Sequence, residues 1–368
     1  MMPVRILSPT LELLGQIDDY ESLQFVRRWH RPGEFELHIN RHKQNTDVLQ
    51  KGNLVLLNAS LGKVGIIRHK EINLDQEGKG GETVRISGPS LSGVTQTRIT
   101  IPPDLSAYDT VNAEAETVLK HYVDNNIVNP TDADRKIDIV STATDQARGD
   151  TIRWQSRYKK LHEELEEISK ATGLGWNIYL DFAEMEWVFE VYEGVDRTSG
   201  QSVNPPVIFS PEFDAIEILE FMDSDIDFRN VGYTAGQGEG ADREVLEVGT
   251  SSGLDRREVF FDARDVEETL DLQSRGEQRL SDHEQDKYLS GRILEESPFI
   301  YKEDYDLGDM VTVQNKDWGV TLDTRITEIT EIYEPAGFRI DAVFGNKAPT
   351  FIDKVKDEFK DVEKEVRR

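Results

Sequence analysis

Arginines beside carboxylates recur in this sequence and form its clearest pattern with a chemical use. They occur in Gly194-Val195-Asp196-Arg197-Thr198, in Gly253 to Glu258 and in Asp262 to Asp265. A guanidinium forms planar two-point hydrogen bonds with a carboxylate, so such clusters can hold loops in place or join copies of a protein. The interface candidates are therefore Arg197, Arg256, Arg257 and Arg264. Pairing within the chain, worth under about 1 kcal/mol for an exposed pair, is an equal alternative.

The last residues show a second pattern, with a use in assembly. Apolar residues recur there at spacings of 3 and 4, and they are Ile352, Val355, Phe359, Val362 and Val366. Charged residues fill most positions between them, which is typical of a heptad seam. Two heptads fall short of the length that indicates a coiled coil. The pattern therefore predicts an amphipathic helix that either joins copies or packs on its own domain.

Motifs for catalysis or metal binding are weak. The stretch Asp223 to Asp227 resembles the start of a calcium loop, but Phe228 replaces the turn glycine and Thr234 the bidentate acid. Gly236 to Gly240 lacks phosphate-loop spacing and a following lysine, which favours a flexible hairpin. The chain has no cysteine, and its histidines lack the spacing of a metal site. We expect no cofactor, no metal and no enzymatic activity.

The charge of the chain is strongly negative. Its 368 residues include 71 Asp and Glu against 43 Lys and Arg, a net charge of −28. A surface of this sign repels a phosphate backbone, which excludes an ordinary DNA-binding protein. Residues 211–270 alone hold 17 carboxylates against 5 arginines. No stretch approaches the roughly 18 apolar residues of a membrane span, so we expect no membrane insertion.

Strand signals dominate the first hundred residues, where short apolar or alternating runs are separated by turn residues. These runs predict a barrel or a sandwich. Helical spacing begins after Pro103, where Asp109 or Thr110 is expected to cap a helix through Tyr122. A second helix is expected at 158–172, ended by Gly173, followed by a strand pair at 175–192. Residues 194–206 are rich in turn residues and predict a linker.

The rest of the chain predicts one more helix at 266–280 and a last block of strands from 288 to 344. The expected fold class is mainly β with α+β insertions, built around two β-barrel-like domains. The expected segments are a first β-barrel-like domain (1–103), an α+β domain (104–205), an acidic α+β region (206–287), a second β-barrel-like segment (288–347) and a C-terminal amphipathic helix (348–368).

Several residue strings resemble tail-hub proteins of siphovirus-like phages and prophages. Besides the arginine stretches and Gly236 to Gly240, they are Val4 to Pro9, Leu11 to Gly15, Tyr20 to Leu23, the Pro32 to Phe35 turn after Trp29, Phe209 to Phe213 and Leu307 to Val313. Their order and number span almost the whole chain. Such proteins are similar to the baseplate hub of contractile tails. The resemblance implies a trimer in which two barrel-like domains per copy form a pseudo-sixfold ring that continues the tail tube.

The resemblance implies a structural role. We expect a hub at the distal end of a phage or prophage tail, located in the virion after assembly in the host cytoplasm. The implied partners are two further copies, a tail-tube or distal-tail protein, and a tip or fibre protein. DNA is expected to pass through the lumen without specific binding, since a negative wall keeps a passing genome from sticking.

Two other functions stay open at this stage. A peptidoglycan hydrolase would use an acid pair among the carboxylates. A carbohydrate-binding receptor module would stack sugars on aromatic side chains such as Trp176, Trp187 and Trp318, although tryptophans at strand positions are more often core. Many hub proteins carry a C-terminal extension with wall-cleaving modules, and this chain stops at Arg368. We therefore expect any such activity to belong to another protein.

Overall fold

The computed structural model of the chain describes residues 2–345, except for 58–59, 61, 75–79, 265, 267–268 and 282. Residue contacts divide the chain into two compact units. The first unit comprises Met1–Glu217 and Arg292–Ala342, and the second is built around Ile218–Gly291. This grouping is coarser than the five segments expected from the sequence, whose boundaries stay a prediction. In the described part of the chain, no helix combines the length and the apolar character needed to cross a membrane.

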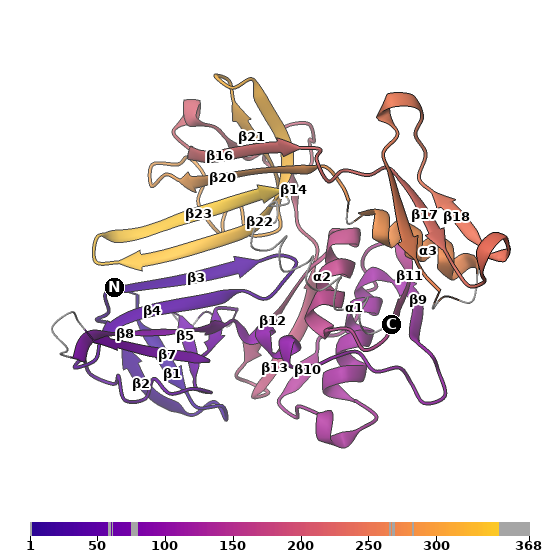
Figure 1. Cartoon of the computed structure of the whole chain (residues 1–368). Coiled ribbons are helices and arrows are strands. Elements are labelled where there is room, and N and C mark those ends of the chain that lie inside the picture. Colours follow the sequence, from indigo (N-terminus) through magenta and orange to yellow (C-terminus); the bar gives the residue numbers. More distant parts are fainter. Residues whose placement is uncertain are drawn as a thin grey trace. The chain divides into compact units, whose positions relative to one another are not determined.

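Two sheets share one core at the start of the first unit (Figure 1). One sheet has the order β2-β1-β5-β6, and the other contains β3, β4, β8 and β7 in that order. The strands are β1 Val4–Leu7, β2 Leu13–Ile17, β3 Ser22–Arg28, β4 Glu34–Asn40, β5 Leu54–Leu57, β6 Val64–Ile66, β7 His69–Leu74 and β8 Gly80–Pro89. In β4 every second residue is buried, namely Phe35, Leu37 and Ile39, because successive side chains of a strand point to opposite faces.

The strands near the C-terminus extend the second of these sheets. β22 (Val320–Glu334) pairs antiparallel with β3, and β21 (Met310–Asn315) pairs with β22. β23 (Gly337–Gly345) lies beside β22 on its other side. The expected fold class, mainly β with α+β insertions, is confirmed. The sharing of one sheet by the first and last β blocks was not predicted, because this pairing joins residues as far apart as Arg28 and Glu328.

An α+β region separates the two β blocks along the chain. α1 (Ala115–Val123) and α2 (Leu161–Thr172) share a core with the sheet β10-β13-β12, whose strands are Val140–Thr142, Glu186–Tyr192 and Gly175–Asp181. The helix expected at 158–172 is confirmed, and Gly173 ends it with a left-handed φ of 73°. The expected helix cap at Asp109 or Thr110 is wrong, because both residues lie in a strand. Asp109 begins β9 (Asp109–Glu114), which pairs with β11 (Thr151–Ser156), so α1 starts later.

Residues 194–206, expected as a linker, form a loop with one short strand, and their role as a boundary between segments stays a prediction. Asp196–Arg197 forms β14, which pairs parallel with β21, and β15 (Ile208–Phe209) does the same. The Gln201 side chain accepts hydrogen bonds from the backbone N–H groups of Val203 and Asn204. The turn residues therefore use their polar groups within the loop, and the pairing of β14 and β15 with β21 holds the loop in place.

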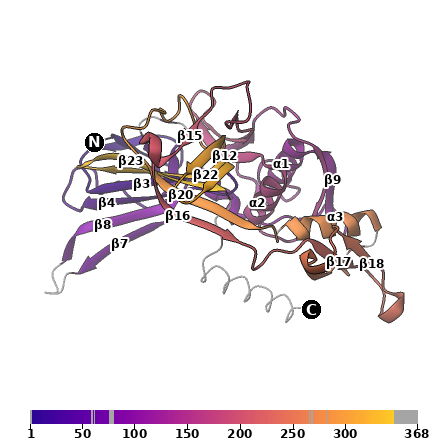
Figure 2. The same cartoon turned by 90° about the horizontal axis from the view of Figure 1, so that it is seen from above.

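The second unit is a small layer of one sheet and one helix. The sheet order is β18-β17-β19, with β17 Val231–Ala235, β18 Val245–Val248 and β19 Glu258–Asp262. α3 (Thr269–Ser281) packs on one face, where Gly276 lies against Thr234 and Val248 (Figure 2). The helix expected at 266–280 and the hairpin at Gly236 to Gly240 are confirmed. β16 (Ile216–Ser224) and β20 (Asp286–Ile293) pair with each other.

Short helical turns complete the described structure. They lie at Leu91–Thr97, Asp124–Val128, Ala133–Arg135, Pro211–Phe213, Gly240–Asp242 and Gly253–Asp255.

Candidate functional site

Arg197 belongs to a loop that is closed by Asp309. Its Nε donates to Asp309 Oδ2 at 3.0 Å, and the backbone N–H of Val195 donates to Oδ1 at 2.9 Å. The N–H of Asp306 also donates to Oδ2, at 3.1 Å. Both oxygens of a nearly buried carboxylate are thus used within the chain. Arg197 fastens this loop, and its expected role between copies stays a prediction.

Arg256 lies between two carboxylates on the second unit. Its Nε donates to Glu258 Oε1 at 2.5 Å, and its Nη2 lies 3.1 Å from Glu247 Oε1. Nη2 also donates to the Tyr233 hydroxyl at 2.7 Å, and the guanidinium stacks on that ring. The hydrogen bonds to Glu258, Glu247 and Tyr233 raise the pKa of Arg256 above its usual value. The group is therefore a fixed positive charge held at the surface.

Arg257 and Arg264 lie elsewhere on the second unit. Arg257 donates to the backbone carbonyl and to the carboxylate of Asp225, both at 2.5 Å. Arg264 is 66% exposed, and its Nε is 3.8 Å from Asp262. Arg243 binds that same carboxylate more closely, at 2.6 Å. The four predicted arginines thus do not form one site. The seam residues Ile352, Val355, Phe359, Val362 and Val366 lie outside the described residues.

The stretch that resembles a calcium loop is bound to basic side chains instead. Lys287 Nζ lies 3.1 Å from Asp223, and Arg257 binds Asp225. In the portion of the chain that the structure describes, no three His, Asp or Glu side chains gather as metal ligands do. Of the tryptophans considered for sugar binding, Trp176 and Trp187 are core residues. Trp318 is 52% exposed in the turn between β21 and β22.

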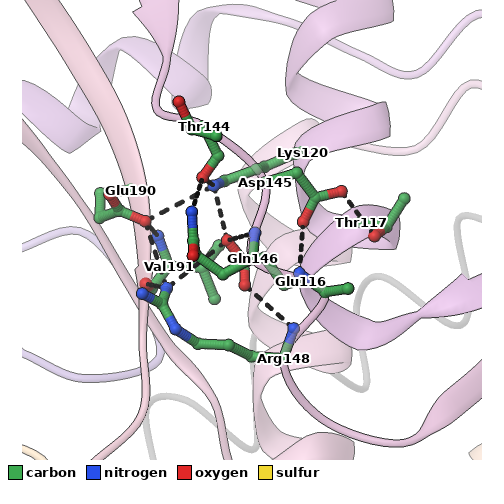
Figure 3. Close-up of polar contacts among 10 residues, drawn as sticks. Glu116, Thr117, Lys120, Thr144, Asp145, Gln146, Arg148, Glu190 and Val191 are labelled. Carbon is green, nitrogen blue, oxygen red and sulfur yellow. Dashed lines mark hydrogen bonds and ion pairs between the residues drawn. The ribbon is translucent and has the colours of Figure 1, made fainter.

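A buried charged network, not predicted from the sequence, lies in the α+β region around Glu116 (Figure 3). The Glu116 carboxylate is fully buried, and Lys120 Nζ donates to its Oε1 at 2.6 Å. The backbone N–H groups of Gln146 and Arg148 each donate to it at 3.1 Å. Lys120 also donates to the Thr144 carbonyl at 2.9 Å. One carboxylate thereby holds the loop around residue 146 against α1.

Glu190 of β13 completes this network. Its Oε1 lies 3.5 Å from Lys120 Nζ and 3.4 Å from Arg148 Nη1. Arg148 Nη1 also donates to the Val191 carbonyl at 2.5 Å. Two carboxylates and two cations thus neutralise one another across α1, the loop and β13, as Figure 3 shows. The only signal of this site in the sequence is the spacing of four between Glu116 and Lys120 on a helix.

A second buried pair joins Lys63 to Glu331 of β22. The hydroxyls of Tyr301 and Tyr333 donate to the two Glu331 oxygens, at 2.7 and 2.5 Å. Burial lowers the pKa of Lys63 to about 8, although Glu331 opposes this shift. Burial also acts to raise the pKa of Glu331, but Lys63 and the two hydroxyls outweigh it and bring that pKa below its usual value. Arg27 extends the network by donating to Tyr301 at 2.7 Å.

The lowered pKa values of the buried carboxylates suit residues that hold loops in place better than residues that transfer protons. Burial would raise the pKa of Glu116, but hydrogen bonds from Lys120 and two backbone N–H groups bring it below its ordinary value. The pKa is likewise lowered at Asp145, where the Thr117 hydroxyl and the Ala147 N–H are the donors. A general acid that works near neutral pH needs the opposite shift. These carboxylates are therefore suited to hold loops.

In the α+β region a histidine pairs with a buried carboxylate at a distance that would suit an acid–base couple. His121 Nε2 lies 2.7 Å from Oδ1 of the buried Asp109, and Asn125 Nδ2 donates to the other carboxylate oxygen at 3.3 Å. The Tyr122 hydroxyl donates to the Asp109 carbonyl at 2.9 Å. These contacts all run from α1 and the turn after it to the first residue of β9. They orient α1 against β9.

Comparison with known proteins agrees with the resemblance seen in the sequence. Residues 3–346 match the family model described as Siphovirus ReqiPepy6 Gp37-like protein. No curated protein sequence matches the chain. The resemblance to tail proteins of siphovirus-like phages and prophages is confirmed by this family match and by the solved structures that share the fold.

Three solved tail proteins share this fold at low sequence identity. The 43 kDa tail protein of a Shewanella oneidensis prophage is 12% identical with a TM-score of 0.59, over 93% of this chain and 98% of that one. A tail protein of Neisseria meningitidis is 13% identical with a TM-score of 0.55, over 94% and 96%. A prophage tail protein of Listeria monocytogenes is 12% identical with a TM-score of 0.53, over 99% and 100%.

Proposed function

The chain belongs to the Siphovirus ReqiPepy6 Gp37-like family, and we propose that it is the structural hub at the distal end of a phage or prophage tail. Three copies close into a ring that continues the tail tube. The ring joins a tail-tube or distal-tail protein on one side to tip or fibre proteins on the other. It assembles in the host cytoplasm and ends in the virion.

The observation that carries this proposal is the extent of the matches. The family model covers residues 3–346, and the shared fold covers at least 93% of this chain in each of the three prophage or tail proteins. A match of this extent involves the whole architecture, from the N-terminal sheets to the last strands. It therefore supports a role as a component of the tail.

The charge of the chain supports a position around the path of DNA. Each copy carries a net charge of −28. A ring of three copies carries on the order of 80 negative charges before counterions bind. Such a wall repels phosphate, which lets a genome pass without specific binding. The lumen is therefore proposed to be acidic.

The buried charges support a structural role. In both networks of the first unit the carboxylates bind cations, and the pKa values of Glu116 and Glu331 are lowered. We therefore assign wall-cleaving activity to other proteins of the tail.

The experiment is to mix the purified chain with the tail-tube and distal-tail proteins of the same phage and to measure the mass of the product by sedimentation. We expect a complex that contains three copies of this chain. A chain that stays monomeric and binds neither protein would contradict the proposal. Clearing of a peptidoglycan gel by the purified chain would contradict the purely structural role.

A further inference from the structure

The first unit carries a basic and apolar surface on a chain that is otherwise acidic. Leu105 is fully exposed, Tyr158 is 59% exposed and Ile99 is 42% exposed. Three arginines lie close to these apolar residues: Arg98 precedes Ile99, Arg157 precedes Tyr158, and Arg135 binds the Ile99 carbonyl. We call this surface the Tyr158 patch, and its residues are Arg98, Ile99, Leu105, Arg135, Arg157 and Tyr158.

Hydrogen bonds to backbone carbonyl groups bring the segments of the Tyr158 patch together. The N–H of Tyr158 donates to the Thr100 carbonyl at 2.8 Å. Arg135 Nη2 donates to the Ile99 carbonyl at 2.6 Å, and Arg98 Nε donates to the Arg135 carbonyl at 3.0 Å. These contacts join the segments at residues 98–100, 135 and 157–158, and Arg157, which lies over the ring of Tyr108, brings the segment that follows Leu105 beside them.

The arginines of the patch bind backbone carbonyls and aromatic rings, and Asp132 is the carboxylate that acts electrostatically on Arg135. Arg98 and Arg135 donate to backbone carbonyls, and Arg157 lies over the rings of Tyr108 and Tyr158, at 5.8 and 5.3 Å from the ring centres. Within the residues that the structure describes, these three arginines form no ion pair. An arginine that already lies on an aromatic face keeps its N–H groups free for a carboxylate in the same plane. The arginines of the patch can therefore bind carboxylates of an acidic surface.

The backbone of the patch is held in an uncommon conformation. Leu105 has a φ of 65° and Tyr158 a φ of 51°, both in the left-handed region. Such a conformation costs roughly 1 kcal/mol or more for a non-glycine residue, and it concentrates at sites that bind. The two most exposed apolar side chains of the patch are therefore the ones presented by strained backbone.

The second unit offers a surface of matching character. α3 covers one face of its sheet, and the other face, which we call the β17 face, carries Val245, Glu247, Glu258 and Phe260, each between 46% and 58% exposed. The pairing of β17 with its neighbours places these four side chains on the same side as Tyr233. Arg256 lies between the two glutamates, so this trio keeps a net negative charge. Asp262 lies on the same face and binds Arg243, whose guanidinium lies over the Phe260 ring. The β17 face therefore keeps a net negative charge beside its apolar side chains, while the Tyr158 patch is apolar and basic.

We infer that the Tyr158 patch of one copy binds the β17 face of the next copy. This inference rests on the proposed trimeric hub. A contact between two different surfaces of the same chain is head to tail, and such a contact closes into a ring when the rotation allows it. The arginines of the patch meet Glu247 and Glu258, and the apolar side chains of the two surfaces cover one another. Arg256, predicted from the sequence as an interface residue, lies within this contact.

The test is a pair of charge reversals measured by native mass spectrometry of the full chain. Arg157→Glu and Glu258→Arg alone are each expected to raise the dissociation constant of the trimer at least about tenfold, because each places like charges in contact. The chain with both changes is expected to form trimers again, because the pair is restored with its charges exchanged. Arg41→Glu, which changes an exposed arginine elsewhere on the first unit, is the matched control and is expected to leave the trimer intact.

A second variant removes apolar surface without a change in charge. Leu105→Asn suits the left-handed backbone, since asparagine adopts positive φ more readily than leucine, so the fold is expected to persist. It is expected to weaken the trimer in the same direction as Arg157→Glu. Circular dichroism of each variant is expected to match that of the wild type.

The outcomes separate this inference from the proposed function. A trimeric wild type whose Arg157→Glu and Leu105→Asn variants stay fully trimeric would overturn the inference and leave the hub intact. The same holds if both single reversals dissociate and the double variant does not reassociate, because the two surfaces then do not pair. A wild type that stays monomeric with its tail-tube and distal-tail partners would overturn the proposed function itself.

Discussion

The two units hold pairs of a cation and a carboxylate in different surroundings. In the first unit the carboxylates of Glu116 and Glu331 are fully buried, and each binds a lysine as well as backbone N–H groups or hydroxyls. In the second unit the pairs of Arg256 and Arg257 lie at the surface, with carboxylates that are about half exposed. The residue types alone do not distinguish the two cases.

Burial therefore decides how much an ion pair contributes to the free energy of unfolding. A buried carboxylate that loses its charge leaves a cation without its partner in a medium of low polarity, at a cost of several kcal/mol. An exposed pair is screened by water and contributes little. The first unit uses its charges to fasten loops to its core, and the second unit keeps its charges available at the surface. The contrast between the units can be tested by replacing a buried charged residue of the first unit and an exposed one of the second unit.

The largest effect is expected for Glu116→Gln in the first unit. The change keeps the shape of the side chain but removes the charge that Lys120 and Arg148 share, which is expected to lower the free energy of unfolding by about 3 kcal/mol. All five tryptophans belong to the first unit, so their fluorescence during urea denaturation reports its unfolding. A loss below about 1 kcal/mol would show that the network of Figure 3 does not hold the first unit together.

A smaller effect is expected from acid, through His30 in the first unit. Its Nδ1 lies 2.7 Å from the Ser169 hydroxyl. Burial and the nearby Lys170 and Arg325 lower the pKa of His30 to about 3. Below pH 6.5 the unfolded chain therefore takes up a proton that the folded chain does not. The free energy of unfolding is expected to fall by up to about 1.4 kcal/mol per pH unit as the pH drops from 6.5 toward 3.

The range from pH 6.5 to 5 isolates His30, because the lowered pKa values of Glu116 and Glu331 affect stability only at lower pH. Tryptophan fluorescence also separates it from His283, whose pKa is lowered too but which belongs to the second unit. His30→Gln keeps a partner for Ser169 and is expected to flatten the pH dependence in this range. An unchanged slope in that variant would contradict the assignment.

The smallest effect is expected for Arg257→Met in the second unit. The change removes an exposed pair with Asp225, and it is expected to cost less than about 1 kcal/mol in the free energy of unfolding. Hydrogen exchange is expected to speed up at residues 225–230, where the arginine holds the chain, and to stay unchanged at β9 and α1. Global unfolding of the second unit by this one change would contradict the contrast between the units.

Local features of the fold were predictable from the sequence, and long-range pairing was not. Apolar spacing and Gly173 were enough for α2, and alternation was enough for β4. The pairing of β22 with β3 was not predictable, because neither strand's sequence indicates a partner so distant in the chain. Asp109 was expected at a helix end and begins a strand, where its carboxylate binds His121 and Asn125, and sequence alone does not show these tertiary contacts.

The charged sites show the same division. The arginine–carboxylate stretches were visible as patterns, and three of the four arginines bind carboxylates within 3.1 Å. The buried networks were missed, because composition does not show which of 71 acids become buried. The Tyr158 patch was missed for a similar reason, since its segments meet only through the tertiary contacts of residues 98–108, 135 and 157–160.

Electron cryomicroscopy of the chain bound to its tail-tube or distal-tail protein tests the proposed hub most directly. We predict three copies around one axis, with an opening wide enough for duplex DNA and a wall in which carboxylates outnumber lysines and arginines. Three copies without an opening, or an opening lined mainly by lysine and arginine, would contradict the proposal.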